Sequence, residues 1–224
     1  MPDNTLRTHI RASRRLYRRG NLQLERWRED NQPKYCRAQF EASGAAFTPE
    51  NTVFFWGHQP SKDGRITASC LSQWFIADFH VGGTPYICME QFMMASKARL
   101  FEDEETLVRI LKSSDPKEIK ALGRQVKGFD EAVWNEAKHL IILNGNFCKF
   151  TQNPALQAYL LASGERTLVE ASPYDTIWGV GLAAEDPRIQ DPRQWRGENL
   201  LGFALMEVRD EIRRTLDDKQ AQRT

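Results

Sequence analysis

Long hydrophobic runs are missing from this sequence. No apolar stretch approaches the roughly 18 to 20 residues that a membrane-spanning helix needs. The first fifteen residues, MPDNTLRTHIRASRR, also lack the apolar centre of a secretory signal. These absences argue against a membrane partner and against secretion, so we expect a cytoplasmic protein.

Cysteine and histidine are few and scattered. The four cysteines show no C-x-x-C spacing and the four histidines do not cluster, which argues against a disulfide framework and a zinc site. The phosphate-binding motif G-x-x-x-x-G-K-[ST], a G-x-G-x-x-G after a strand and the metalloprotease motif H-E-x-x-H are absent too. We therefore expect reduced thiols, no metal and no cofactor.

Charge is nearly balanced overall but unevenly distributed. The net charge is +1, yet residues 1–28 hold eight arginines against Asp3 and Glu25. Three interpretations compete for this basic segment: a solvated helix face, an organelle transit peptide, or an arm that contacts the phosphates of nucleic acid. We assign residues 1–50 to a basic N-terminal extension of helical character.

The rest of the composition is that of a soluble folded protein. Apolar residues make up 41% and charged residues 27% of 224 residues, enough to form one folded unit. The run NTVFFWG predicts a strand, and QWFIADFHVGGTPYICM predicts a hairpin that turns at Gly82 and Gly83. From Met89 onward the apolar residues take a helical period.

Helix-start signals divide the second half of the chain. Asp115 and Pro116 begin a helix that should run to about Lys127, Asp130 caps the next, and Pro154 begins another that ends at Gly164. RTLVEAS predicts a short strand, followed by about 27 irregular residues, 173–199. A final helix through residues 201–212 and a frayed tail at 217–224 complete an α+β fold, predominantly helical, with a small β-sheet.

One apolar helix carries two charges on the same face. In MEQFMMASKARLF, Glu90 and Lys97 are seven residues apart, which is two helical turns. On spacing alone this pair is either a solvated stripe or a site. Arg124 and the irregular segments SPYDTIWGVGL and WRGENLLG complete the set of candidate residues.

Several blocks in this order resemble a known family. FFWG, LSQWF, MEQFMMASKARLF, ALGRQV, LIILNGNFCKF, LVEASPYDTIWGVGL and WRGENLLGFALMEVR are similar to blocks of the YbiA-like proteins of the NADAR superfamily. The resemblance covers about residues 53–213. It implies a YbiA-like catalytic domain, which we place at 51–216, and hydrolysis of an N-glycosidic bond.

The resemblance implies two substrate classes. Bacterial and plant members cleave phosphoribosylamino-pyrimidine intermediates of riboflavin biosynthesis, releasing ribose 5-phosphate. Other members remove ADP-ribose from guanine bases, for which the basic segment would be a nucleic-acid contact. A third interpretation is a module that binds ADP-ribose or another nucleotide without turnover.

The resemblance also assigns residues. The family's glutamate and lysine fall on Glu90 and Lys97, and its D-x-x-W-G block on Asp175, Trp178 and Gly179. Its N-x-L-G block begins at Asn199. Where the family usually has histidine and asparagine, this sequence has Gln91 and Gln73, which puts substrate orientation in question.

Chemistry gives these side chains roles. Glu90 or Asp175 can stabilise positive charge on the ribose, and a neutral Lys97 can attack C1 and pass through a Schiff base. Arg124 and the amides of WGVG suit a phosphate, and Trp178 or Trp56 suits the face of a pyrimidine. The alternatives are a surface cation for Arg124, core tryptophans, and a loop cap for Asp175. The expected substrate-binding residues are therefore Trp56, Gln73, Arg124, Trp178, Gly179 and Asn199.

Overall fold

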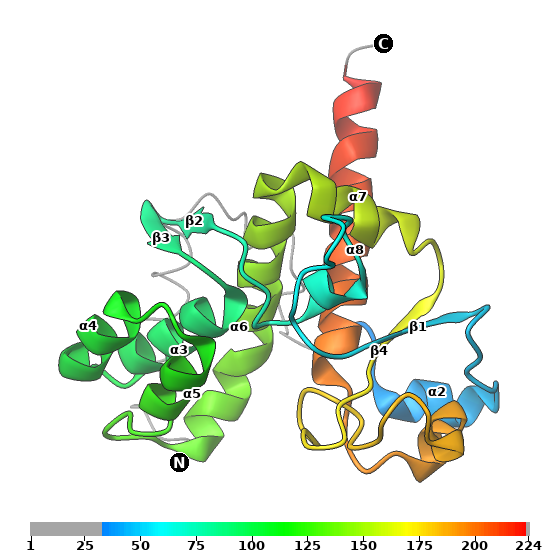
Figure 1. Ribbon diagram of the computed structural model, residues 1–224, viewed down its shortest axis with the longest axis horizontal. Helices are drawn as coiled ribbons and strands as arrows, with labels where there is room; N and C mark the ends of the chain where they lie inside the picture. The colour runs from blue at the N-terminus through cyan, green and yellow to red at the C-terminus, as the bar shows by residue number, and fades with distance from the viewer. Residues whose placement is uncertain (1–32, 223–224) are drawn as a thin grey trace, which may run out of the picture. The chain divides into compact units, whose positions relative to one another are not determined.

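The computed structural model describes residues 33–222 and divides them into two compact units, where one folded unit was expected. Unit 1 comprises Ile76–Asn153, and the described part of unit 2 comprises residues 33–75 and 154–222 (Figure 1). Most of the expected basic extension, residues 1–32, lies outside the described residues. No helix among residues 33–222 is long and apolar enough to cross a membrane.

Unit 1 is a β-hairpin followed by four helices. Gly82 and Gly83 both have positive φ, the conformation that a tight hairpin turn needs and that glycine adopts without strain. The elements are β2 Phe79–Val81, β3 Thr84–Tyr86, α3 Met89–Leu100, α4 Glu104–Lys112, α5 Pro116–Gly123 and α6 Glu131–Gln152. The hairpin turn and α3 lie where the sequence predicted them.

Aspartates begin three of these helices. The carboxylates of Asp103, Asp115 and Asp130 accept hydrogen bonds from the free amides at the starts of α4, α5 and α6. Helix α5 ends at Gly123 rather than at about Lys127, because the chain turns at Arg124 into a short loop before α6. The sequence reasoning assigned no helix at α4.

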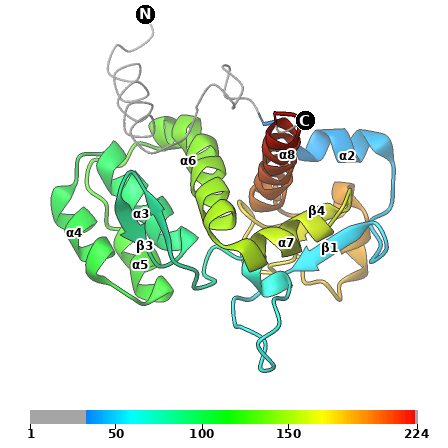
Figure 2. The same ribbon diagram turned by 90° about the horizontal axis from the view of Figure 1, so that it is seen from above.

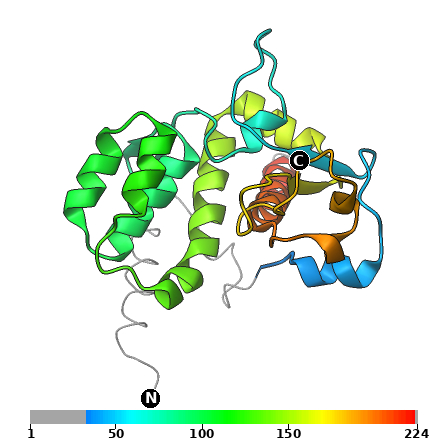
Figure 3. The same ribbon diagram turned by 60° about the horizontal axis from the view of Figure 1, so that its bottom comes forward.

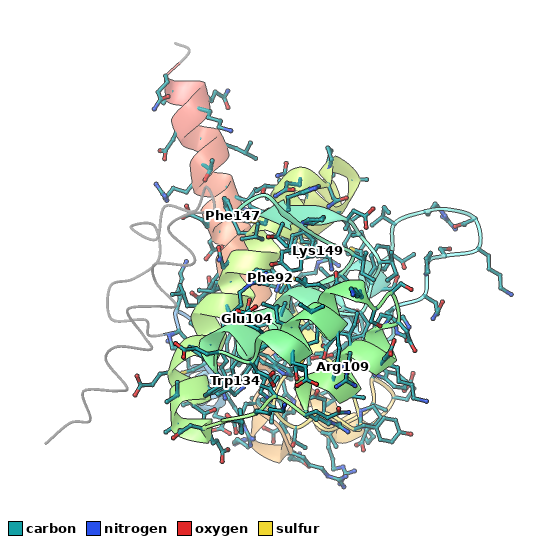
Figure 4. The ribbon with its side chains drawn as sticks, turned by 90° about the vertical axis from the view of Figure 1, so that its left-hand side faces the viewer. Phe92, Glu104, Arg109, Trp134, Phe147 and Lys149 are labelled. Carbon is teal, nitrogen blue, oxygen red and sulfur yellow. The ribbon has the colours of Figure 1, made fainter. Side chains whose placement is uncertain are left out.

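Helices α3 and α6 approach each other closely because Gly145 has no side chain. A Cβ at Gly145 would lie 2.4 Å from Cδ1 of Phe92 and 2.6 Å from Sδ of Met89. Figure 4 labels Phe92 on α3 and shows Trp134 and Lys149 toward opposite ends of α6. Met89 and Phe92 are almost fully buried in this contact.

Unit 2 is built on two parallel strands that are far apart in the sequence. Strand β1, Thr52–Phe55, pairs with β4, Thr167–Glu170, in the register Val53 opposite Leu168 (Figure 2). Its remaining elements are α2 Arg37–Ser43, the short 3-10 turns η2 Ala68–Leu71, η3 Pro187–Gln190 and η4 Pro192–Gln194, and the helices α7 Pro154–Ala162 and α8 Leu200–Ala221.

The irregular segment 173–199 is anchored to the start of α8 (Figure 3). Backbone amides of Leu200 and Leu201 donate to the carbonyls of Ile177 and Trp178. Gly202 then lies against β4, where an added Cβ would be 2.1 Å from the carbonyl oxygen of Leu168. The absence of a side chain at residue 202 therefore allows α8 to pack on β4.

The α+β fold, predominantly helical, is confirmed. Two further details differ from the expectation. The small sheet is two separate two-stranded sheets within the described residues. The expected frayed tail at 217–224 is helical as far as Ala221, because α8 continues for 22 residues.

Replacing Gly202 by alanine should destabilise unit 2 by about 1 to 3 kcal/mol, because the new methyl group overlaps a backbone oxygen that cannot move alone. Urea unfolding would measure the change. Lys219→Ala, on the exposed end of the same helix, is the control and should change stability by less than about 0.5 kcal/mol. Equal stability of Gly202→Ala and the parent would contradict this account of the packing.

Candidate active site

Glu90 and Lys97 lie on α3 as the sequence predicted, and neither is a solvated surface charge. The side chain of Glu90 is 2% exposed, and that of Lys97 is half-buried. The two groups interact electrostatically. The interpretation of this face as a solvated stripe is therefore wrong for Glu90.

The amine of Lys97 sits in a defined environment. Its Nζ donates a hydrogen bond of 2.9 Å to the carbonyl oxygen of Gly123, at the end of α5. Nζ also lies 4.1 Å from the ring centre of Phe129 and 5.8 Å from that of Trp134. A carbonyl and two aromatic rings hold the amine in place.

Burial lowers the pKa of Lys97, and the negative charge of Glu90 opposes that effect. Desolvation disfavours the ammonium form, so a larger fraction of this amine is neutral at a given pH than of a lysine in water. A half-buried lysine with a lowered pKa is the form of the residue that acts as a nucleophile in enzymes.

Arg124 lies next to this group. It follows Gly123, whose carbonyl accepts from Lys97, and its side chain is exposed. Unit 1 thus brings together Glu90 and Lys97, and Arg124 follows the residue whose carbonyl Lys97 contacts. An exposed guanidinium is suited to an anionic group of a ligand.

Gln91 faces away from Glu90 because one residue along a helix is a rotation of about 100°. Its Oε1 accepts from the amide of Ile87, at 2.9 Å. Its Nε2 donates to the carbonyls of Ile110 and Ser113, at 3.1 and 3.0 Å. Gln91 therefore joins α3 to the end of α4.

Asp175 shapes the first turn of the irregular segment in unit 2. Its Oδ1 accepts from the amides of Ile177 and Trp178, at 2.9 and 2.8 Å. The structure thus shows the loop cap that the sequence reasoning weighed as an alternative. A catalytic role of Asp175 remains a prediction.

Asn199 and Gly179 are packed against the end of β4. The Nδ2 of Asn199 donates to the carbonyl of Leu168 and its Oδ1 accepts from the amide of Glu170, each at 2.9 Å. A Cβ at Gly179 would lie 2.8 Å from the carbonyl oxygen of Glu170. Both residues hold the irregular segment to the strand, and their expected contact with substrate stays a prediction.

An aromatic pair projects from unit 2. Trp56 follows β1 and is 57% exposed, and its ring centre lies 6.1 Å from that of Tyr174, which is 86% exposed. Trp178 is partly buried. The interpretation of Trp56 as a core residue is therefore wrong, and Tyr174 joins the candidates that the sequence reasoning missed.

Gln73 has a buried acceptor that no neighbour uses. The residue is 6% exposed, and within residues 33–222 its Oε1 has no hydrogen-bond partner. A buried amide oxygen without a donor is costly, so it is a candidate to receive a hydrogen bond from a ligand.

Sequence reasoning also missed Lys149, which is fully buried on α6. The signal was present, since this lysine lies at i+4 and i+7 from Gly145 and Ile142 within the apolar run LIILNGNFCKF. Among residues 33–222, no cluster of three or more histidine, cysteine, aspartate or glutamate side chains is placed to hold a metal ion.

Comparisons with known proteins place this fold in a family. The family profile described as the NADAR domain matches residues 54–213. The sequence is 42% identical over 164 residues to N-glycosidase R617 of Acanthamoeba polyphaga mimivirus, which covers 71% of this chain and 95% of that protein. It is 37% identical over 109 residues to the chloroplastic riboflavin biosynthesis protein PYRR of Zea mays, which covers 47% of this chain and 15% of that protein.

A solved structure shares the fold. The NMR structure of the Escherichia coli protein YbiA aligns with a TM-score of 0.57 at 24% sequence identity, covering 77% of this chain and 90% of that chain. This likeness confirms the YbiA-like α+β fold.

Replacing Gln91 by leucine should destabilise unit 1 by about 1 to 3 kcal/mol, because the buried carbonyl of Ser113 loses the Gln91 donor and that of Ile110 keeps only the backbone amide of Ser113. Thermal and urea unfolding would measure the loss. The matched control is Gln125→Leu, since that amide is exposed. If both variants unfold alike, the link from α3 to α4 does not contribute as described.

Proposed function

Because this chain belongs to the NADAR domain family, we propose that it is an N-glycosidase that cleaves the ribosyl C–N bond of phosphoribosylamino-pyrimidines, the intermediates of riboflavin biosynthesis. The names of the mimiviral N-glycosidase and the maize riboflavin protein support the reaction and the substrate class respectively. The observation that carries the proposal is the buried Glu90 coupled to a half-buried Lys97 with a lowered pKa.

Lys97 acts first as the nucleophile. Its neutral Nζ attacks C1 of the ribose, the C1–N bond breaks, and the electron pair of that bond goes to the nitrogen of the pyrimidine amine. The carboxylate of Glu90 takes the proton from Nζ and passes it to the departing nitrogen, which leaves as a neutral amine. The sugar is then bound to Lys97 through C1 and opens to a Schiff base.

Water completes the reaction. Hydrolysis of the Schiff base returns the amine of Lys97 and releases ribose 5-phosphate, so the sum is one substrate and one water giving the sugar phosphate and the aminopyrimidine. In the competing route, Glu90 only stabilises the positive charge that develops at C1, and water attacks directly. The two routes differ in whether the sugar becomes attached to Lys97.

The remaining residues have binding roles in this proposal. Arg124 binds the 5-phosphate, for which the supporting observations are its exposure and its position next in sequence to Gly123, whose carbonyl accepts from Lys97. Within unit 2 taken by itself, Gln73 has an unpartnered oxygen suited to a hydrogen-bond donor, and Trp56 has an exposed ring suited to the face of a flat base. Asp175, Trp178, Gly179 and Asn199 shape the loop to which the expected phosphate-binding amides belong.

Incubation with 5-amino-6-(5-phosphoribosylamino)uracil should release ribose 5-phosphate. Glu90→Gln should reduce kcat by about 10²- to 10⁴-fold, the usual contribution of a proton-transferring group. Lys97→Met should abolish turnover and also the covalent sugar adduct that borohydride traps in the parent protein. Arg99→Met, which removes a cation from the same helix, is the control and should retain activity.

The outcomes separate the candidate functions. A parent protein that turns over without a trapped adduct would favour the carboxylate-only route. A folded parent that releases no ribose 5-phosphate would refute the substrate assignment. The same assay with ADP-ribosylated guanine in DNA would then test the alternative activity, and a ligand that raises the melting temperature without cleavage would indicate a binding module.

The rate should also depend on pH. Because only neutral Lys97 attacks, kcat should increase with pH, with a midpoint below the ordinary pKa of lysine, since burial lowers the pKa of this amine. The same shift makes folding less favourable below the lowered pKa, where the buried amine must carry a charge. A pH–rate profile would measure the midpoint, and a rate that decreases through this range would exclude Lys97 as the nucleophile.

A further inference from the structure

Lys149 has no role in the proposed reaction, yet its burial is unusual. The side chain is 0% exposed and is among the largest fully buried side chains of the described residues. Lysine is almost never fully buried without compensation, because removing an ammonium group from water is expensive. An opposite charge close to Lys149 is therefore required for the amine to remain protonated.

Helix geometry places Lys149 at the start of α3. Gly145 contacts Met89 and Phe92, and Lys149 lies four residues later on the same face of α6. At the other end of α6, Trp134 lies beside Lys97, so the two helices run antiparallel and Lys149 is level with the first turn of α3 (Figure 4). Glu90 belongs to that turn.

A shared neighbour connects the two charges. Cys88 precedes α3, and its thiol interacts electrostatically with both Glu90 and Lys149. The charge of Glu90 raises the pKa of this thiol, and the charge of Lys149 lowers it. Cys88 itself carries no charge at neutral pH, because burial raises its pKa to about 11. The nearby Arg99 is hydrogen-bonded to Tyr86, since its Nη1 donates to the hydroxyl of Tyr86 at 2.7 Å.

We propose that Lys149 compensates the negative charge of Glu90 and so is the positioning residue that keeps this carboxylate ionised and able to accept a proton. The compensation follows from the structure, whereas its catalytic consequence rests on the proposed function. Glu90 then has an ammonium group on α6 and the reactive amine of Lys97 two turns along its own helix. A protonated Glu90 would be unable to take the proton from Lys97.

A double-mutant cycle on stability tests the compensation without any assay of activity. Glu90→Gln and Lys149→Met each leave one buried charge without its partner, which is strongly destabilising, whereas the double variant buries no charge of this pair. Urea unfolding would measure the unfolding constant of the four proteins. If the two single changes were independent, the double variant's constant would increase by the product of the two single increases. We expect its constant to be at least about tenfold smaller than this product predicts. If Lys149→Met alone does not fold but the double variant does, the coupling between the two residues is strong, and this outcome also supports the proposal.

The matched control is an exposed pair of the same chemistry in unit 1. Lys127 and Glu105 lie 2.7 Å apart with side chains 71% and 69% exposed. The cycle of Glu105→Gln and Lys127→Met should show a coupling of less than about fivefold. Coupling at Glu90 and Lys149 no larger than this, or a double variant that fails to fold when Glu90→Gln folds, would overturn the proposal.

Activity provides the second readout. Lys149→Arg retains a positive charge and should restore most of the kcat that Lys149→Met loses, with KM nearly unchanged in both, because Lys149 acts through Glu90. Equal kcat in folded Lys149→Met and the parent would overturn the positioning role. Strong coupling between Glu90 and Lys149 in a protein whose parent cleaves no N-glycoside would support the charge pair and refute the proposed function. An active parent whose Glu90 and Lys149 show no coupling would support the proposed function and refute the charge pair.

Discussion

Burial of charge at the first turn of α3 is the constraint on which the candidate site depends. A carboxylate that is 2% exposed must be stabilised by other charges or by dipoles, because water does not reach it. The start of a helix supplies part of this stabilisation, since its free amides favour negative charge. The amine of Lys97 interacts electrostatically with this carboxylate, and the chemistry proposed for Lys97 uses the same group.

That arrangement requires α3 and α6 to lie close together, and small residues allow it. Gly145 lets α6 approach Met89 and Phe92, and Gly123 lets the end of α5 approach Met94. Through this second contact the carbonyl of Gly123 reaches the amine of Lys97. The glycines of unit 1 therefore determine the surroundings of Glu90 and Lys97.

Unit 2 uses its sequence motifs in a comparable way. The amide of Asn199 bonds to β4 through both of its polar atoms, and Gly202 gives α8 room beside the same strand. Asp175 turns the chain before Trp178 through two backbone amides. The motif residues of this unit hydrogen-bond mainly to backbone groups. Their spacing is therefore recognisable in the sequence, but their partners, which almost any residue type can supply, are not.

The sequence was sufficient for features that depend on neighbouring residues. Caps at Asp115 and Asp130, the hairpin turn at Gly82 and the face shared by Glu90 and Lys97 all follow from local patterns, and the structure has them. The pairing of β1 with β4 joins segments more than a hundred residues apart, so no local pattern predicts it. The helical period of the apolar run around Lys149 does indicate its burial, whereas no local pattern indicates which residue of another element lies near its amine.

The division of roles also bears on which N-glycoside is the substrate. The chemistry assigned to Glu90 and Lys97 acts at C1 of a ribose, which phosphoribosylamino-pyrimidines and ADP-ribosylated guanine share, so unit 1 does not discriminate between their leaving groups. An exposed tryptophan beside an exposed tyrosine accepts the face of any flat base. Discrimination must then come from directional contacts. Under the proposed function, the unpartnered oxygen of Gln73 is a candidate for such a contact, since an amide oxygen accepts a hydrogen bond only from a group that presents a donor.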